Sequence, residues 1–160
     1  MDDFFLIDLF KEGSNDVWQE ATDGLIPSDA VVCGEEDNRH VYIVRFMTKE
    51  GKMIQGKLIE GSKLAKGFYS GVQTSSIYQV LINRDQKRQF TWVSTNTKNI
   101  PKDALQTSGE QGTNLYVGRF VHASGSTLVG EFNASSSVLR YADEEQEKEL
   151  LDEFEVLCVS

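Results

Sequence analysis

The chain has 160 residues and a formal net charge of −9, from 16 basic and 25 acidic side chains. Because nucleic-acid affinity comes largely from Lys and Arg side chains that neutralise phosphates, nucleic acid and anionic membrane surfaces are poor candidates as partners. No apolar run approaches the ~20 residues that a membrane-spanning helix needs, so membrane insertion is not expected. The densest basic group, Arg84, Lys87 and Arg88, is expected to be a solvated hairpin loop.

Residues 1–15 form an N-terminal extra segment. The stretch MDDFFLIDLFKEG is apolar, but Asp2 and Asp3 stand where a signal peptide carries positive charge, and Asp8 interrupts the apolar run. We therefore expect no signal peptide and a cytoplasmic protein, with release by an unconventional route left open. The segment FFLIDLF is expected to add a strand, and a short helix is the alternative.

Two stretches of the chain repeat each other at an offset of 74 residues, which is the separation of Trp18 and Trp92. An ungapped overlay of 18–67 on 92–141 matches 12 of 50 positions, and the matches include Trp, Pro and Gly. Such periodicity indicates a tandem repeat, which we place at 16–83 and 84–160. The identical pairs are Trp18/Trp92, Ile26/Ile100, Pro27/Pro101, Asp29/Asp103, Ala30/Ala104, Glu36/Glu110, Tyr42/Tyr116, Arg45/Arg119, Phe46/Phe120, Gly51/Gly125, Gly56/Gly130 and Ser62/Ser136.

Each repeat is predicted to consist of strands joined by turns. The clearest strands are rich in β-branched and aromatic residues and are bounded by polar loops. A tight loop at Gly51 or Gly125 predicts a β-hairpin with the segment that follows. The expected strands cover 16–21, 40–47, 53–61 and 77–82 in the first repeat and 89–95, 115–121, 128–136 and 153–158 in the second.

The predicted fold class is all-β, with two tandem pseudo-symmetric repeats of antiparallel strands packed together. A half of this size buries only a modest part of its surface, so each half gains from packing on its twin. Because every repeat begins and ends with a strand, strands could be exchanged between the halves or within a homodimer. Along 40–47, alternation predicts two faces, Tyr42/Val44/Phe46 and Ile43/Arg45/Met47.

The segment 141–153, YADEEQEKELLDE, contains good helix formers and is expected to carry a helical turn or two. Its acidic character also makes 143–155 a candidate docking surface, although such a run is usually a solvated face.

Several single residues are assigned structural roles. Trp18 and Trp92 are expected to be core anchors. Arg45 and Arg119 recur on an otherwise apolar face and are expected to bridge to carboxylates, with Asp29 and Asp103 as the candidates. The two cysteines, Cys33 and Cys158, make no disulfide framework and are expected to be buried free thiols in a reducing compartment.

The order and spacing of these motifs resemble the DM-nine repeat family over nearly the whole chain, from about residue 16 to 159. A Trp is followed by Pro-x-x-Ala, a Gly-containing loop, a strand of the type LYVGRF (115–120), a Gly-Lys ending as in QGK (55–57), and a closing strand such as FEVL (154–157). The resemblance implies a tandem-repeat, mannose-binding lectin of the kind that invertebrates use in responses to microbes or parasites. Mannose or mannose-containing glycans are therefore the implied partners.

The resemblance also implies the site. An acidic residue after the loop glycine and the lysine that ends the Pro-Gly-Lys stretch hold the sugar, and they correspond to Glu36, or its neighbour Asp37, and Lys57. A weaker second site, in the second repeat, corresponds to Glu110, Gln111 and Glu131. The chain departs from the family pattern in three features: Gln55 replaces the Pro, Glu131 replaces the Lys, and the Gly-Lys-Glu-His block is absent from the first repeat.

Sugar chemistry suits these residue types. A carboxylate accepts hydrogen bonds from vicinal hydroxyls, and an ammonium donates up to three. An aromatic side chain, for which Tyr42, Tyr69 and Trp18 are candidates, could cover the apolar face of the ring. The alternative for Glu36 and Lys57 is an ordinary surface ion pair.

No enzymatic activity, metal or cofactor is predicted. His40 and His122 are the two histidines and fall at unrelated repeat positions, and the chain has no His-x-x-x-His, Gly-x-Ser-x-Gly or phosphate-binding glycine loop. A Ser–His pairing in space stays open. The alternative to a lectin is an intracellular protein–protein interaction module that has lost sugar binding.

Overall fold

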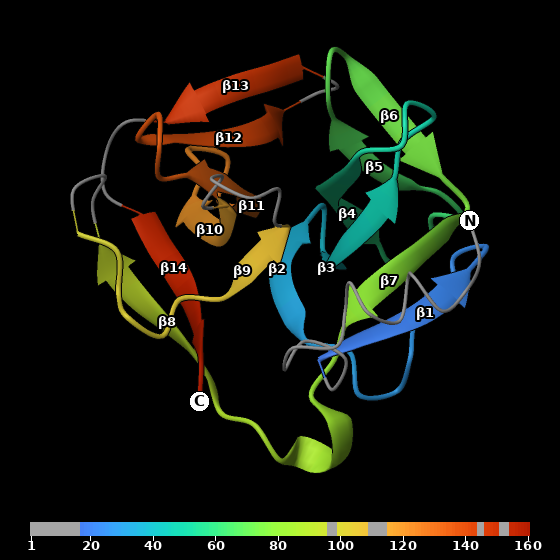
Figure 1. Ribbon diagram of the computed structural model, residues 1–160, viewed down its shortest axis with the longest axis horizontal. Coiled ribbons are helices and arrows are strands. Elements are labelled where there is room, and N and C mark those ends of the chain that lie inside the picture. Colours follow the sequence, from blue (N-terminus) through green and yellow to red (C-terminus); the bar gives the residue numbers. More distant parts are fainter. Residues whose placement is uncertain (1–16, 96–98, 109–114, 144–145, 151–153) are drawn as a thin grey trace.

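A computed structural model describes residues 17–95, 99–108, 115–143, 146–150 and 154–160. The chain is all-β, as predicted, with its strands hydrogen-bonded into one antiparallel sheet system (Figure 1). The strands are β1 (Trp18–Thr22), β2 (Val32–Glu36), β3 (Arg39–Met47), β4 (Met53–Ile59), β5 (Ala65–Phe68), β6 (Val72–Ser75), β7 (Ile77–Leu81), β8 (Phe90–Thr95), β9 (Gln106–Ser108), β10 (Leu115–Val121), β11 (Thr127–Asn133), β12 (Val138–Asp143), β13 (Gln146–Leu150) and β14 (Phe154–Val159).

The strands β1–β7 and β8–β14 pair in the same pattern. In the first set, β7 pairs with β1 and β3, and β3 also pairs with β2 and β4. In the second set, β14 pairs with β8 and β10, and β10 also pairs with β9 and β11. Even the registers correspond, since Arg45 lies opposite Gln79 and Arg119 lies opposite Glu155. The duplication in the sequence is therefore a duplication of topology.

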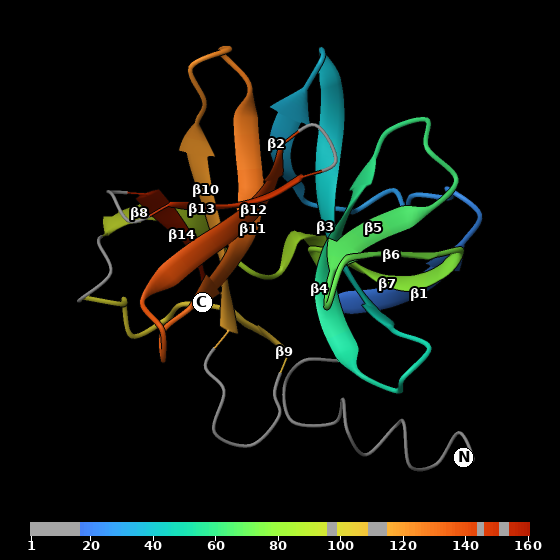
Figure 2. The same ribbon diagram turned by 90° about the horizontal axis from the view of Figure 1, so that it is seen from above.

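The halves meet along a seam in the middle of the sheet path. Strand β2 pairs with β11 of the other half, with Glu35 opposite Thr127. The strand of the second half that is equivalent to β2 is β9, and it lies against β4 of the first half. Figure 2 shows the β2–β3 and β10–β11 hairpins projecting next to each other on one side of the molecule. The seam thus brings loops and strand ends from both halves together.

Three apolar clusters follow this arrangement. One lies within the first half and includes Tyr42, Val44 and Phe46, and a second lies within the second half around Phe132 and Phe154. The third is shared, because residues of both halves form it: Val17, Trp18, Cys33, Val41, Ile43 and Leu81 from the first, and Leu105, Val117, Val129 and Leu157 from the second. The predicted packing of the halves and the predicted split of the β3 faces are both confirmed.

Two glycine turns close equivalent hairpins as predicted. Gly51 has φ 84° before β4 and Gly125 has φ 93° before β11, a backbone region that glycine enters without steric cost. The linker between the halves contains a short 3₁₀ turn, η1 (Arg84–Gln86). The basic group there is exposed as expected, but it belongs to this linker and not to a hairpin, since β7 and β8 pair with other strands.

One expectation about the second half is wrong. Residues 146–150, expected to be helical, form β13, which pairs with β12 as β6 pairs with β5. Cross-strand pairing at this repeat position overrides helix propensity. The first and last described strands of each half pair with each other, β1 with β7 and β8 with β14. The extra strand expected within residues 1–15 lies outside the described residues.

Arg119 bridges to a carboxylate as expected, but to that of Glu155 and not of Asp103, and the Nε of Arg45 bonds to the amide of Gln79. Arg45 stacks 4.3 Å from the centre of the Trp18 ring and donates from Nε to Gln79 Oε1 at 2.7 Å. Arg119 stacks 4.0 Å from the centre of the Trp92 ring and donates to Glu155 Oε1 at 2.9 Å. Gln79 on β7 and Glu155 on β14 lie directly opposite Arg45 and Arg119, which brings their side chains within hydrogen-bonding reach. Within the described ranges, no helix has the length and apolar character needed to cross a bilayer.

Candidate functional site

The residues expected to hold a sugar include one close ion pair. Lys57 Nζ lies 2.7 Å from Glu36 Oε2, and the two side chains are 12% and 18% exposed, respectively. Glu36 ends β2 and Lys57 lies in β4, so the two strands that flank β3 supply one group each. The pair is therefore partly screened from water, yet both groups still reach the surface.

The neighbouring turn positions Glu36. Asp37 and Asn38 have φ angles of 52° and 63°. Two successive positive φ values are the mark of a tight hairpin turn that Asp and Asn tolerate well. Asp37 is exposed at this turn and lies outside the ion pair. Its backbone conformation sets where β2 ends.

Lys57 also lines a pocket at the seam between the halves. The empty space of this pocket is about 530 Å³, including the part that opens to solvent. Equivalent positions of the two repeats line it, so it straddles the pseudo-symmetry axis. The lining residues are Ile43, Gln55, Gly56, Lys57, Lys66, Gly67 and Phe68 from the first half and Val129, Gly130, Glu131, Arg140 and Tyr141 from the second.

Two cross-strand rows give the pocket its charges. In the first half, Lys57 lies opposite Lys66 on β5. In the second half, Glu131 lies opposite Arg140 on β12. Like charges directly opposite each other are unfavourable in an antiparallel pair, whereas opposite charges stabilise it. The carboxylate of Glu36, supplied by β2, offsets this repulsion in the first row.

Glycines hold the strands close at the pocket. A Cβ atom placed on Gly56 would lie 2.6 Å from the Lys66 carbonyl oxygen, and one on Gly130 would lie 2.3 Å from the Arg140 carbonyl oxygen. Real Cβ atoms essentially never approach backbone oxygens so closely. These two equivalent glycines therefore permit the close approach of β5 to β4 and of β12 to β11, on which the two charged rows depend.

Gln55 forms a polar bridge across the seam. Its Nε2 donates to the Gly130 carbonyl oxygen at 2.9 Å, and its Oε1 accepts from Thr107 Oγ1 at 2.8 Å. Gln55 and Thr107 are 7% and 0% exposed. The equivalent positions in the other half, Val129 and Cys33, are apolar and belong to the shared core cluster. The side chain that replaces the family's Pro thus ties one half to the other.

The sequence assigned Glu131 to a second, weaker site, but Glu131 lines the same pocket as Lys57. Glu110 and Gln111, the other residues of that site, lie outside the described residues. Among the aromatic candidates, Trp18 is a core residue as expected and Tyr42 is buried, while Tyr69 is 38% exposed.

Sequence reasoning missed the other pocket residues. Lys66 and Arg140 are both basic and lie 74 residues apart, which is the repeat offset. The sequence does carry this recurring basic charge at the repeat offset. A comparison that counts only identical residues does not detect a Lys/Arg pair. Phe68 and Tyr141 also line the pocket and supply the aromatic surface that was expected from other residues.

His122 and Ser124 form a Ser–His pairing of the kind that the sequence leaves open. His122 Nδ1 lies 2.9 Å from Ser124 Oγ and accepts from the Ser124 backbone N–H, which is the geometry of an exposed turn. No group of three His, Cys, Asp or Glu side chains is placed to hold a metal ion within the described ranges. Burial raises the pKa of the Cys33 thiol to about 12, so this thiol is not a nucleophile at neutral pH.

Comparison with known proteins places this geometry in context. The family model described as DM9 repeat matches residues 37–150. Among solved structures, the nematode sperm cell motility protein MFP2B is similar with a TM-score of 0.65 and 16% sequence identity, over 91% of this chain and 44% of that protein. The chain therefore spans less than half of that structure, and at this identity the likeness shows the fold alone. A search of curated proteins found no match.

Proposed function

We propose that the chain, which belongs to the DM9 repeat family, is a carbohydrate-binding, lectin-like protein. Glu36 and Lys57 are its proposed sugar contacts. The DM9 repeat is a binding-type domain. The observation that carries the proposal is the 2.7 Å pair of Lys57 and Glu36, partly exposed at a pocket of the seam.

The pair retains unused hydrogen-bonding capacity. An ammonium has three N–H donors and a carboxylate has about four acceptor positions, so one mutual hydrogen bond leaves most of both sets available. Two adjacent sugar hydroxyls, each a donor and an acceptor, match a carboxylate and an ammonium held side by side. The rigid β2–β3–β4 arrangement fixes both groups before the ligand arrives, which lowers the entropic cost of binding.

The pocket also offers an apolar surface for the ring. Phe68 and Tyr141 line it, one from each half, alongside Ile43 and Val129. The C–H face of a hexose packs against such side chains while its hydroxyls are directed to polar ones. Asp37, on the exposed turn next to Glu36, is proposed as an additional acceptor at the rim.

The expected affinity is modest. Hydrogen bonds to charged groups contribute about 1.5–3 kcal/mol each, and association entropy offsets a large part of two or three such contacts. Dissociation constants from micromolar to millimolar follow. Mannose is the sugar implied by the resemblance of the repeats, and recognition of mannose-bearing surfaces of microbes or parasites is the role that goes with it.

Calorimetry with methyl α-mannoside tests the proposal. Lys57→Ala should abolish measurable binding, and Glu36→Gln should weaken it at least tenfold, because the neutral amide is a poorer acceptor. Asp37→Asn removes the rim carboxylate while keeping a residue that tolerates positive φ, so it isolates the contribution of that side chain.

The matched control is Lys63→Ala, which removes a lysine from an exposed loop position of the first half. This variant should bind like the wild type. Absence of binding by the wild-type protein up to tens of millimolar, or equal binding by Lys57→Ala and Lys63→Ala, would rule out the proposed site.

A protein–protein interaction module is the second candidate, which the altered Pro-Gly-Lys stretch at Gln55 and the altered Gly-Lys-Glu-His stretch favour. The observed role of Gln55 weakens that argument, since its side chain links β4 to Gly130 and Thr107 across the seam. Retention on mannose-agarose compared with capture by host-cell proteins separates the two candidates.

A further inference from the structure

The contacts across the seam differ between its two sides, although the halves share one topology. On one side, Thr107 of β9 and Gln55 of β4 are buried, and Thr107 Oγ1 donates to Gln55 Oε1 at 2.8 Å. Gln55 Nε2 donates to the Gly130 carbonyl oxygen at 2.9 Å. On the other side, the equivalent residues are Cys33 of β2 and Val129 of β11, and both belong to the shared apolar cluster. One side of the seam is therefore polar and the other apolar.

Each half supplies one residue to each side. The first half carries the polar Gln55 and the apolar Cys33, and the second carries the polar Thr107 and the apolar Val129. The halves therefore match as unlike partners, because each polar residue meets its complement in the other half. If two first halves met at a seam, Gln55 of each would face Cys33 of the other. Two second halves would set Thr107 against Val129.

Such pairing of like halves would leave buried polar groups without partners. A glutamine amide carries two donors and an acceptor, and a thiol is only a weak donor. The Cys33 thiol also has a contact within its own half, since its Sγ lies 3.4 Å from the Val31 carbonyl oxygen. It is therefore a poor replacement for the Thr107 hydroxyl. A buried polar group that loses its partner is strongly unfavourable, whereas a matched apolar pair is not.

We infer that Gln55 and Thr107 determine which partner each seam face accepts: a first half pairs with a second half and disfavours another first half. The seam then closes within one chain, and exchange of halves between copies is suppressed. Single buried polar residues fix register and partner number in coiled coils by the same physics. This inference concerns the pairing of the halves and does not depend on sugar binding.

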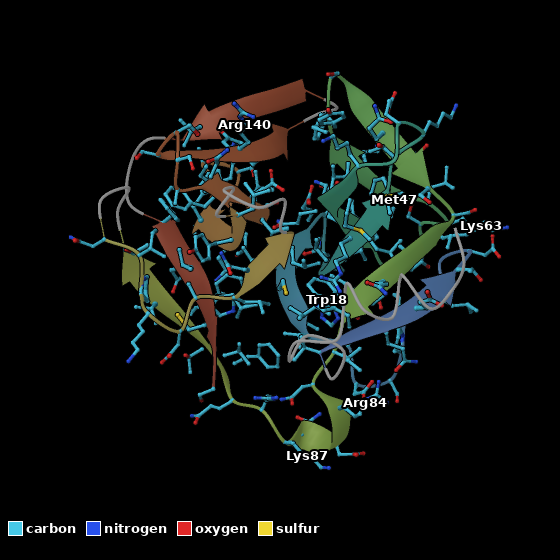
Figure 3. The ribbon with its side chains drawn as sticks, in the orientation of Figure 1. Trp18, Met47, Lys63, Arg84, Lys87 and Arg140 are labelled. Carbon is cyan, nitrogen blue, oxygen red and sulfur yellow. The ribbon has the colours of Figure 1, made fainter. Side chains whose placement is uncertain are left out.

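The linker alone does not decide the partner. Residues 82–89 separate β7 from β8, and Arg84 and Lys87 mark their place at the opposite end of the view from Arg140 (Figure 3). A short linker gives the second half of the same chain an effective concentration on the order of millimolar. Another copy can compete with it when the side chains at the seam favour that copy.

Exchanging one residue of each pair tests the selection in the full chain. Gln55→Val/Val129→Gln places a valine opposite Thr107 and a glutamine opposite Cys33, so both contacts become those of like pairing. In urea unfolding at low micromolar concentration, its folding equilibrium constant should fall at least about thirtyfold. Adding Cys33→Thr and Thr107→Cys should restore the constant to within about threefold of the wild type, because the glutamine then faces a threonine again.

The same two-residue exchange should change the partner. Each first half then has two apolar seam residues and each second half has two polar ones, so that like halves of two copies match. Light scattering at about 100 µM should therefore give Gln55→Val/Val129→Gln at least twice the mass of the wild type. The four-residue exchange should return to the wild-type mass.

Met47→Val/Val121→Met is the matched control, because it exchanges an equivalent pair that is exposed. It should change neither stability nor mass. Equal stability of Gln55→Val/Val129→Gln and the wild type would overturn the inference, and so would a four-residue exchange that restores nothing. Lost stability without a rise in mass would reduce the two residues to structural contacts and refute partner selection.

Discussion

Replacing Gln55 with Val should destabilise the whole molecule, because this side chain joins the two halves inside the seam. It accepts from Thr107 Oγ1 at 2.8 Å and donates to the Gly130 carbonyl oxygen at 2.9 Å. Thr107 is fully buried. The variant therefore removes two hydrogen bonds and leaves the Thr107 hydroxyl without its acceptor.

The magnitude follows from these contacts. Each buried hydrogen bond contributes about 1 kcal/mol net, and an unsatisfied buried donor costs about 1–3 kcal/mol. The expected loss is about 2–4 kcal/mol, a large part of the ~5–15 kcal/mol that stabilises a typical domain. Adding Thr107→Val should recover about half of the loss, because both partners are then apolar. The equivalent positions, Val129 and Cys33, already show that an apolar pair packs at this geometry.

Urea denaturation followed by tryptophan fluorescence measures these free energies, with Gln89→Val, at an exposed linker position, as the control. The slope of the unfolding free energy against urea should stay constant if the variants change stability alone. A loss below about 0.5 kcal/mol for Gln55→Val, or a double variant as unstable as the sum of the two singles, would show that the polar bridge does not hold the halves together.

Two further outcomes are expected. Gly130→Ala should lower the free energy of unfolding by about 3 kcal/mol, because its Cβ would lie 2.3 Å from the Arg140 carbonyl oxygen. Gly125→Ala, at φ 93° with open space around it, should lower it by only about 1 kcal/mol. Similar losses for the two variants in thermal unfolding would argue against the close strand approach. Because burial raises the pKa of Cys33 from 9.0 to about 12, its contribution to stability should be complete below pH 9 and disappear as the pH rises toward 12. A thiol reagent that labels native Cys33 rapidly at pH 8 would contradict this burial.

Much of the fold could be predicted from the duplication and from strand periodicity. The alternation along β3 correctly separated Tyr42 and Val44 from Ile43, because residues two apart share a face. The short strands β5 and β6 were missed because their small and polar residues carry no period-2 apolar signal. The composition of β13 favours a helix for a related reason: its pairing with β12 depends on tertiary position and not on its own composition.

The candidate site could be predicted only in part. Glu36 and Lys57 are 21 residues apart, and the repeat resemblance suggested that they meet, which the 2.7 Å contact shows. The pocket itself was not foreseeable, because it forms where β4 and β5 of one half face β11 and β12 of the other. Lys66 and Arg140 line one pocket only because of that juxtaposition, which no local pattern encodes.

The most direct test of this account is to locate a bound sugar. A crystal soaked with methyl α-mannoside should show sugar hydroxyls within hydrogen-bonding distance of the Glu36 carboxylate and the Lys57 ammonium, with the ring lying in the pocket between β4 and β11. A sugar bound on another face, with the Glu36–Lys57 pair unchanged, would contradict the central claim that the seam between the repeats forms the binding site.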